Sequence, residues 1–470
     1  MHAVWERMAG GTAGRGADAG RNGFSSLFRR LSWDFPDRRS TTLSWKSSRN
    51  EVGPIALFDK SFLQSLTVDE AVWFDHFFMP VVCPIFFVET LADLTKQPRA
   101  GSTRTPQDEV RILADKSPVM SASPCVHHMH LAISNLLGHP APRLGQVPLA
   151  GGRPVRSKDG KPGVVFENSP EAESFSRWQR GDFFEVERDA ASSWRAMLGS
   201  LNLPEVAQGM RQLGITPKTC KSIREAHGIA AGLVHSRAEP EVQVGLLFSF
   251  LNVPAHLRGQ IIHEWSSAGF PPLASHAPFA AHVLTVELFF QIALAANLIS
   301  TERASNRADI AYLFYLPFCH LFVSGDKLHQ RCAPAFLSNK QDFLWGPNLK
   351  AALAAINQQL SLSTEAERQQ GLHKLAPRPP GDASNLVVAM WEKHHRMPSD
   401  QPPSPALTAE TERKLVEHLN TFAKSPEAPE VASIPVDELE SIAIERLVPP
   451  KRGSWWVIPK AVADKEQERE

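Results

Sequence analysis

The stretch IALFDKSFL, residues 55–63, decides the fold class of this 470-residue chain. Its four leading apolar residues predict a short strand that ends at Asp59, and a helix start follows at about residues 62–66. A second apolar run, residues 81–86, predicts another extended segment, after which Glu89 opens the helical segment ETLADLTK. This repeated order of strand, acid and helix is typical of an α/β fold.

A second acidic block lies in the C-terminal half of the chain. Asp309 opens a predicted helix that runs to about residue 318, HLFVS (320–324) predicts a strand, and Asp326 follows that strand after one glycine. The interval between the two aspartates is 17 residues (326 − 309 = 17), which fits one helix, a tight turn and one strand. Both aspartates are therefore expected at the same edge of a parallel sheet.

The positions of these acids suggest a cation site. The carboxyl ends of parallel strands line the crevice in which α/β proteins bind ligands. Carboxylates gathered there repel one another and lose hydration, so they need a compensating cation, and hard oxygen ligands suit Mg²⁺ or Mn²⁺. Taken singly, each acid is explained as well by turn chemistry, by helix capping or by a favourable charge at a helix N-terminus. Those explanations do not account for the ordered set of four.

The two blocks resemble the PIN-like domain nucleases. IALFDKSFL resembles the opening strand of a PIN domain, and PIFFVETLADL resembles the segment that carries its second acid. NRADIAYLFYLPFCHLFVSGDKLH resembles the closing half, an Asp-led helix followed by a strand that ends in Ser-x-Asp. The resemblance covers roughly residues 54–96 and 300–350.

The resemblance implies both a fold and a chemistry. The family folds as a three-layer α/β/α sandwich with a mainly parallel sheet, and its acidic cluster binds Mg²⁺ or Mn²⁺ and cleaves phosphodiester bonds, usually of RNA. It implies one set of catalytic and metal-binding residues in this chain: Asp59, Glu89, Asp309 and Asp326. The chief departure is the interval of 220 residues between Glu89 and Asp309 (309 − 89 = 220), because PIN domains are usually compact.

Some neighbouring residues are candidates for a supporting role. Asp93 lies one turn after Glu89, so the two are expected on one helix face. Glu287 lies within an apolar helix, where an unpaired charge is costly, and it is equally well explained as an accessory ligand or as the partner of an arginine. Asn306 and Ser324 are candidates for hydrogen bonds to phosphate or carboxylate. Lys60 and Lys327 are expected either to touch phosphate or to be solvated surface lysines.

The chain divides by composition into five parts. Residues 1–50 are expected to be a disordered basic leader, with nine Lys/Arg and four Asp/Glu (9 − 4 = +5), or alternatively an aromatic arm that grips nucleic acid. The other parts are a discontinuous PIN-like domain at 51–96 and 276–360, a mostly helical insertion at 97–275, a Pro-rich linker region at 361–405 and a C-terminal helical extension at 406–470.

Composition restricts the class of protein. The 50 Lys+Arg balance the 50 Asp+Glu, so any nucleic acid must be held by a local basic patch. Five scattered cysteines without a CxxC pair indicate reduced thiols, and no continuous apolar leader marks a secretory signal. The apolar segment 282–299 carries Glu287, Gln291 and Asn297, which favours a buried helix over a membrane span. CVHHMH (125–130) is too crowded to match a zinc finger.

These observations lead to one main expectation and its rivals. We expect a cytoplasmic divalent-metal-dependent nuclease, with RNA favoured over DNA as the partner and no membrane association. The alternatives are a catalytically inactive PIN-like scaffold that binds RNA or protein, and an unrelated α/β enzyme in which the acids are structural. The sequence leaves open a protein partner, a homo-oligomer, the substrate and the role of the insertion.

Overall fold

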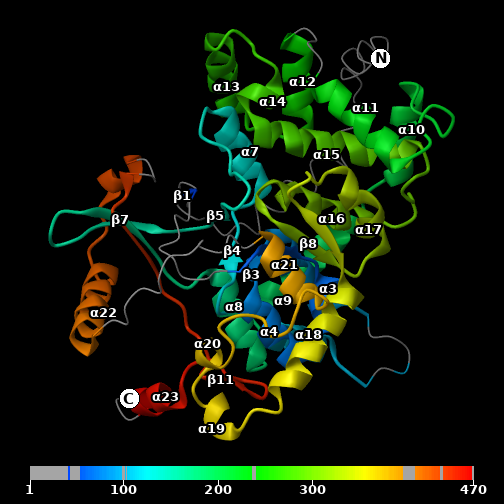
Figure 1. Ribbon diagram of the computed structural model, residues 1–470. Coiled ribbons are helices and arrows are strands. Elements are labelled where there is room, and N and C mark those ends of the chain that lie inside the picture. The colour runs from blue at the N-terminus through cyan, green and yellow to red at the C-terminus, as the bar shows by residue number, and fades with distance from the viewer. Residues whose placement is uncertain are drawn as a thin grey trace.

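The centre of the protein is a five-stranded sheet in which all neighbouring strands are parallel (Figure 1). The structure is a computed structural model that describes residues 41–42, 53–97, 101, 103–235, 240–394, 408–434 and 438–467. Along the sheet the strand order is β4-β3-β2-β8-β9. The strands are β2 Ile55–Phe58, β3 Met79–Val82, β4 Ser123–Pro124, β8 Leu321–Ser324 and β9 Asp342–Trp345. The predicted α/β class with a parallel sheet is therefore confirmed.

The strand order reverses between β2 and β8. From β2 the chain moves outward to β3 and β4, and it then returns to the other side of β2 to form β8 and β9. Phe58 is in register with Val323, so the residues that follow them, Asp59 and Ser324, lie side by side where β2 and β8 end. The carboxyl ends of the strands at such a reversal are the place where α/β proteins typically bind ligands. All four residues of β2 are buried, which explains its uninterrupted apolar sequence.

Short helices follow the strands and hold the candidate acids. The α-helices nearest the sheet are α3 Lys60–Ser65, α4 Val68–Phe77, α5 Pro84–Ala92, α16 Asn306–Ala311, α17 Lys327–Cys332 and α18 Gly346–Leu360. The short 3₁₀ segments among them are η2 Asp93–Thr95, η3 Tyr312–Phe318 and η4 Ala333–Ala335. Helix α4 packs on β3, while α18 packs on α4 and on β8 and β9.

Three predicted boundaries were wrong. The second extended run ends at Val82, and Ile85 and Phe86 belong to α5, because Pro84 occupies the first turn of that helix and presets its backbone. Glu89 therefore lies in the middle of α5 and does not open a helix. The helix expected to begin at Asp309 begins at Asn306, and the segment from Tyr312 onwards is 3₁₀, with Pro317 inside it.

The segment 97–275 contributes both a sheet strand and a layer of helices. Its edge strand β4 pairs with β3, so one strand of the main sheet comes from within the expected insertion. Its helices are α6 Pro106–Lys116, α7 His128–Leu136, α8 Pro170–Gln179, α9 Glu185–Gly199, α10 Leu203–Gln212, α11 Ile223–His235, α12 Pro240–Phe250, α13 Ala255–Ser267 and α14 Leu273–His276. Figure 1 shows α10 to α14 gathered at the top of the view, around α15.

Helix α15, Pro278–Ala295, is the central core helix of that layer. It is long and apolar enough by composition to cross a membrane, but 89% of its apolar window is buried inside the protein. Helices α7, α10, α11 and α14 all pack on it. The prediction of a buried helix in this segment is therefore confirmed.

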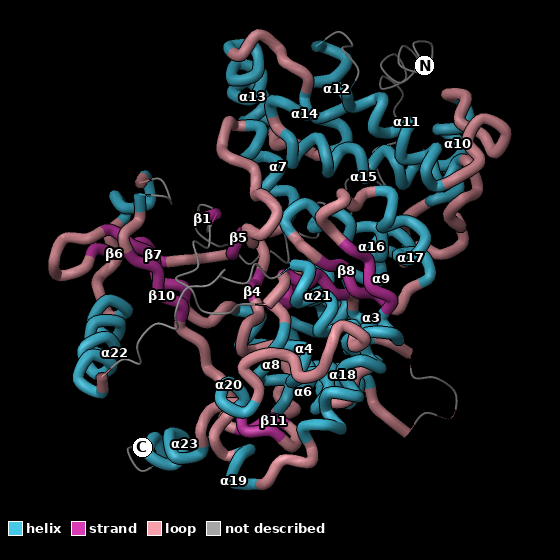
Figure 2. Tube along the Cα trace, in the orientation of Figure 1, coloured by secondary structure: helices cyan, strands magenta, loops and turns pink. Residues whose placement is uncertain are grey.

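The C-terminal part of the chain packs on the main body. Its helices are α19 Glu365–Arg368, α20 Leu372–Leu375, α21 Leu386–His394, α22 Ala409–Ala423 and α23 Lys460–Gln467, with η5 Pro429–Ser433. Its strands are β10 Ser441–Ile444, β11 Lys451–Arg452 and β12 Trp455–Trp456. Figure 2 shows these strands within the region that was expected to be helical, and Trp391 is buried within the region expected to be a linker. Trp391 is buried because it packs on Phe77 of α4. Trp455, in the hairpin of β11 and β12, packs on Trp73 of the same helix.

Small accessory sheets complete the fold. Strand β7 Pro162–Phe166 pairs antiparallel with β6 Arg153–Arg156 and parallel with β10. Strand β1 Thr41–Thr42 pairs with β5 Pro148–Leu149. The prediction of a disordered leader at 1–50 falls outside the described residues, apart from this two-residue strand.

Candidate functional site

Asp59 is the most buried of the four predicted acids, with 3% of the residue exposed. It caps α3, and its Oδ1 accepts a 2.9 Å hydrogen bond from the Phe62 amide. Its Oδ2 accepts 2.7 Å bonds from the hydroxyls of Ser61 and Ser324. Burial acts against the negative charge, but hydrogen bonds from His329 and the two serines outweigh it and lower the pKa of Asp59. Asp59 is therefore an ionised, fully engaged carboxylate.

Asp326 follows β8, the strand next to β2, at the start of α17. It caps α17, and its Oδ1 accepts a 2.6 Å hydrogen bond from the Leu328 amide. Its own amide donates to the Ser324 hydroxyl at 2.9 Å, so Ser324 connects the two strand-terminal aspartates. No described residue donates a hydrogen bond to the second oxygen of Asp326, and the residue is half-buried.

His329 is a buried member of the site that sequence reasoning missed. Its side chain is 1% exposed, its Nδ1 lies 2.7 Å from the Ser324 hydroxyl, and its Nε2 lies 2.6 Å from the main-chain oxygen of Asp309. Burial acts against a positive charge, but the hydrogen bond and charge of Asp59, with those of Asp309, raise the pKa of His329 to about 9. An imidazolium therefore lies inside the acidic cluster. Its position one turn after Asp326 was the only signal in the sequence.

Glu89 approaches the cluster from α5 and is held by Tyr312. The Tyr312 hydroxyl donates a 2.6 Å hydrogen bond to Oε2 of Glu89. Burial and the nearby charge of Asp59 raise the pKa of Glu89, against the opposing effects of Lys60 and this hydrogen bond. No described residue donates to the second oxygen of Glu89. Tyr312 was also missed, because its buried, apolar surroundings in the sequence give no sign of a polar partner.

Asp309 faces the other acids from α16. Burial first, and then the charges of Glu89 and Asp326, raise the pKa of Asp309 to about 7. The residue is half-buried, and no described residue donates a hydrogen bond to its carboxylate. Its main-chain oxygen, by contrast, is fixed by His329. The Asp309 carboxylate is therefore the least compensated of the four.

The structure brings the four predicted acids into one electrostatic cluster. The charge of Asp59 raises the pKa of Glu89, and the charges of Glu89 and Asp326 raise the pKa of Asp309. They come from four elements around the reversal in strand order. Within the described part of the chain, no three His, Cys, Asp or Glu side chains already converge as a ready-made metal site. The oxygens without donors, on Glu89, Asp309 and Asp326, are nevertheless hard ligands of the type that Mg²⁺ and Mn²⁺ accept.

Two of the accessory candidates, Asp93 and Lys60, form an ion pair with each other. Asp93 is paired with cations, at 2.9 Å from Lys60 and 3.5 Å from Lys96. Lys60 is thus neither a free phosphate ligand nor a solvated surface lysine, since it also donates to the Glu89 main-chain oxygen at 3.1 Å.

The remaining accessory candidates differ in how close they lie to the cluster. Glu287 forms an ion pair with Arg307, the second of its two expected roles. Asn306 donates to the main-chain oxygen of Ser300 at 2.9 Å. Only Ser324 lies at the centre of the cluster, and Lys327 is exposed.

The histidine-rich segment 125–130 is part of the core. His127 caps α7, and His128 stacks on Phe314 with its Nδ1 3.2 Å from the Tyr315 hydroxyl. Burial lowers the pKa of His127 to about 3, so it is neutral. All five cysteines are buried free thiols, as the sequence indicates.

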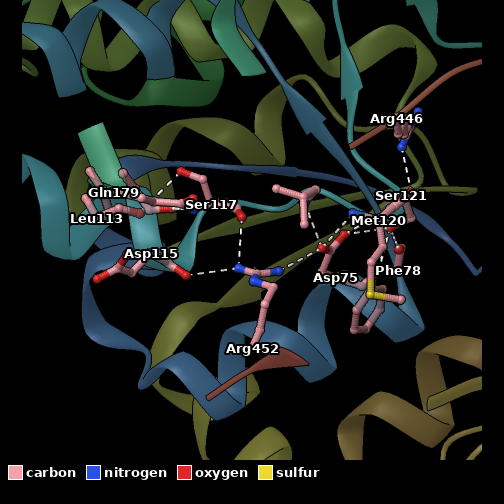
Figure 3. Close-up of polar contacts among 12 residues, drawn as sticks. Asp75, Phe78, Leu113, Asp115, Ser117, Met120, Ser121, Gln179, Arg446 and Arg452 are labelled. Atoms are coloured by element: carbon pink, nitrogen blue, oxygen red, sulfur yellow. Dashed lines mark hydrogen bonds and ion pairs between the residues drawn. The ribbon is translucent and has the colours of Figure 1, made fainter. Parts of the chain in front are cut away.

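A second buried polar centre fixes the C-terminal hairpin to α4 (Figure 3). Asp75, fully buried, accepts hydrogen bonds from the amides of Val119 and Met120 at 2.8 and 2.9 Å and from Arg452 at 3.1 Å. Arg452 also donates to the main-chain oxygens of Asp115 and Ser117 at 3.0 and 2.9 Å. Every strong partner here belongs to the fold, so this centre is structural. It holds the loop that leads into β4.

Comparison with known proteins gave no match to a family model, to a curated protein or to a solved structure. The resemblance to PIN-like domains therefore stays a prediction from the sequence.

Proposed function

We propose that this protein is a divalent-metal-dependent phosphodiesterase, a nuclease that acts on RNA in preference to DNA. The observation that carries the proposal is the position of the four acids. Asp59, Glu89, Asp309 and Asp326 come from segments up to 267 residues apart (326 − 59 = 267), and they interact at the one place where the strand order of a parallel sheet reverses. A structural role for each acid separately does not account for that common position.

The charge balance of the cluster supports cation binding. Asp59 is compensated by His329, and Asp93 by Lys60, but Glu89 and Asp309 have raised pKa values and oxygens without donors. Mutual repulsion of this kind is relieved when a cation binds between the carboxylates. Bound there, Mg²⁺ or Mn²⁺ would lower the pKa of a water and stabilise charge on the phosphate under attack. Glu89, Asp309 and Asp326 would hold the ion.

The residues of the chain would also control protons and position. In the metal-free protein Asp309, with a pKa of about 7, would carry a proton below neutral pH, and it would release that proton when it binds the ion. Tyr312 would keep Glu89 directed towards the cluster, and Ser324 would keep Asp59 and Asp326 together. A three-layer PIN-like arrangement agrees with the parallel sheet, and we place the activity in the cytoplasm with nucleic acid as the partner.

A catalytically inactive PIN-like scaffold is the second candidate. The observation that favours it is the imidazolium of His329, because a built-in cation already neutralises part of the acidic cluster. This candidate predicts that the protein binds RNA equally well with and without EDTA and cleaves none of it.

A nuclease assay separates the two candidates. Wild type, Asp326→Asn and Asp464→Asn are incubated with labelled single-stranded RNA and Mn²⁺. Asp464 is an exposed acid of α23 and serves as the matched control. Cleavage by wild type and Asp464→Asn, but not by Asp326→Asn, supports the nuclease, whereas cleavage that survives Asp326→Asn rejects the proposed site.

A further inference from the structure

The hydrogen-bond pattern divides the four acids into two kinds. Both oxygens of Asp59 accept bonds, from the Phe62 amide and from the Ser61 and Ser324 hydroxyls. Its Oδ2 also lies 3.5 Å from Nδ1 of His329. The Asp59 carboxylate therefore has little capacity left for a further ligand.

The other three acids retain free oxygens. Among the described residues, Glu89 receives one hydrogen bond on Oε2, Asp326 one on Oδ1, and the Asp309 carboxylate none. All three residues are half-buried, and none of their oxygens is among the described side-chain atoms that are fully buried without a partner, whereas Asp59 is buried. A cation that approaches from solvent meets these three carboxylates before it meets Asp59.

His329 connects the engaged acid to a free one. The main-chain oxygen of Asp309 only accepts, so Nε2 of His329 carries the hydrogen of that 2.6 Å bond. Ser324 has a single hydroxyl hydrogen, which it donates to Oδ2 of Asp59. In the bond between Ser324 and His329, Nδ1 of His329 is therefore the donor and the hydroxyl oxygen is the acceptor. The chain Asp59–Ser324–His329–Asp309 therefore joins the N-terminus of α3 to β8, α17 and α16 through polar contacts.

We infer that Asp59, Ser324 and His329 form an internal anchor that positions Asp309, and that Glu89, Asp309 and Asp326 alone contact the metal. This inference rests on the proposed function, which it deepens. It gives Asp59 a positioning role although the acid follows a central strand. It also gives His329 a function that its sequence position does not suggest. Residues that orient metal ligands in this way typically change metal affinity by about 10- to 100-fold when they are lost.

The test is Mn²⁺ binding to the full-length metal-free protein, measured from the free Mn²⁺ signal by electron paramagnetic resonance. Asp309→Asn and Asp326→Asn are expected to abolish stoichiometric binding. Asp59→Asn and Ser324→Ala are expected to retain it with an affinity about 10- to 100-fold lower. Ser324→Thr keeps the hydroxyl and is expected to restore affinity to near the wild-type value.

The outcomes distinguish the inference from the function on which it rests. If wild type binds no Mn²⁺, both fail. If wild type binds Mn²⁺ and Asp59→Asn abolishes binding as Asp309→Asn does, Asp59 is a direct ligand and the inference is overturned while the function stands. If Asp59→Asn does not fold, the two variants of Ser324 decide. Equal losses of Mn²⁺ affinity in Ser324→Ala and Ser324→Thr would overturn the role of the hydroxyl.

Discussion

The hydroxyl of Tyr312 donates a 2.6 Å hydrogen bond to Oε2 of Glu89, across 223 residues of chain. This bond joins the N-terminal acidic block to the C-terminal one, and Tyr312 is fully buried. The long segment between Glu89 and Tyr312 is therefore compatible with a single acidic cluster. It leaves the cluster after α5 and returns to it through α15 and α16. The contact has consequences for both stability and ionisation.

Removal of the Tyr312 hydroxyl is expected to affect both properties. Tyr312→Phe keeps the buried ring and loses one hydrogen bond, which typically contributes about 0.5–1.5 kcal/mol. Because that bond lowers the pKa of Glu89, the pH at which Mn²⁺ affinity reaches half its maximum should move upward. Urea unfolding and Mn²⁺ titration across pH measure the two effects. The control is Tyr315→Phe, whose hydroxyl contacts His128, and it should leave the pH dependence unchanged.

The pKa of Asp309 predicts how metal binding depends on pH. Asp309 must lose its proton to bind a cation, and its pKa is about 7. Mn²⁺ affinity should therefore rise with pH up to about 7, by about tenfold per pH unit below it, and then level off. Calorimetric titrations between pH 5.5 and 8.5 measure the dependence. A flat affinity over this range would contradict the assignment of Asp309 as a ligand.

The same pKa predicts a change in stability without metal. A carboxyl whose folded-state pKa is raised destabilises the protein above its unfolded value of 3.8, and the penalty is complete above about pH 7. Asp309→Asn should therefore raise the free energy of unfolding of the metal-free protein at pH 8, and raise it less at pH 5. Chemical denaturation in EDTA at both values measures the difference. A variant less stable than wild type at pH 8 would show that the carboxylate stabilises the fold.

The raised pKa of His329 stabilises the folded protein, whereas the raised pKa of Asp309 destabilises it. A histidine with a folded-state pKa of about 9 contributes stability that is fully present below pH 6.5 and is lost as pH rises through about 9. The difference in unfolding free energy between wild type and His329→Gln should therefore be largest at pH 6 and shrink by pH 10. A difference that stays constant over this range would indicate that His329 is neutral in the folded protein.

The buried pair of Asp75 and Arg452 should be important for stability and not for catalysis. Asp75→Ala leaves the Arg452 charge without its carboxylate, a change that typically costs about 3–5 kcal/mol in a buried pair. The exposed pair of Lys414 and Glu410 is the control, and Lys414→Ala should cost less than about 1 kcal/mol. Guanidinium unfolding measures both. A small loss for Asp75→Ala would mean that the amides around it are satisfied in another way.

The sequence alone predicts the part of the site that follows strands. Asp59 and Asp326 could be found because each comes after an apolar run, and the spacing of Asp309 and Asp326 defines their module. His329 could not be found, since its role comes from the side-by-side placement of β2 and β8. The edge strand at Ser123 has two residues within a polar loop, so no periodicity marks it. Contacts such as Asp75 with Arg452, 377 residues apart, depend entirely on tertiary structure.

The measurement that tests the central claim most directly is cleavage of a labelled RNA by wild type and by Asp309→Asn, with Mn²⁺ or EDTA. We predict that wild type cleaves only with Mn²⁺, that Asp309→Asn is slower by at least about 10- to 100-fold, and that Asp464→Asn equals wild type. Cleavage by Asp309→Asn at the wild-type rate, or no cleavage by wild type with Mn²⁺, would contradict the account.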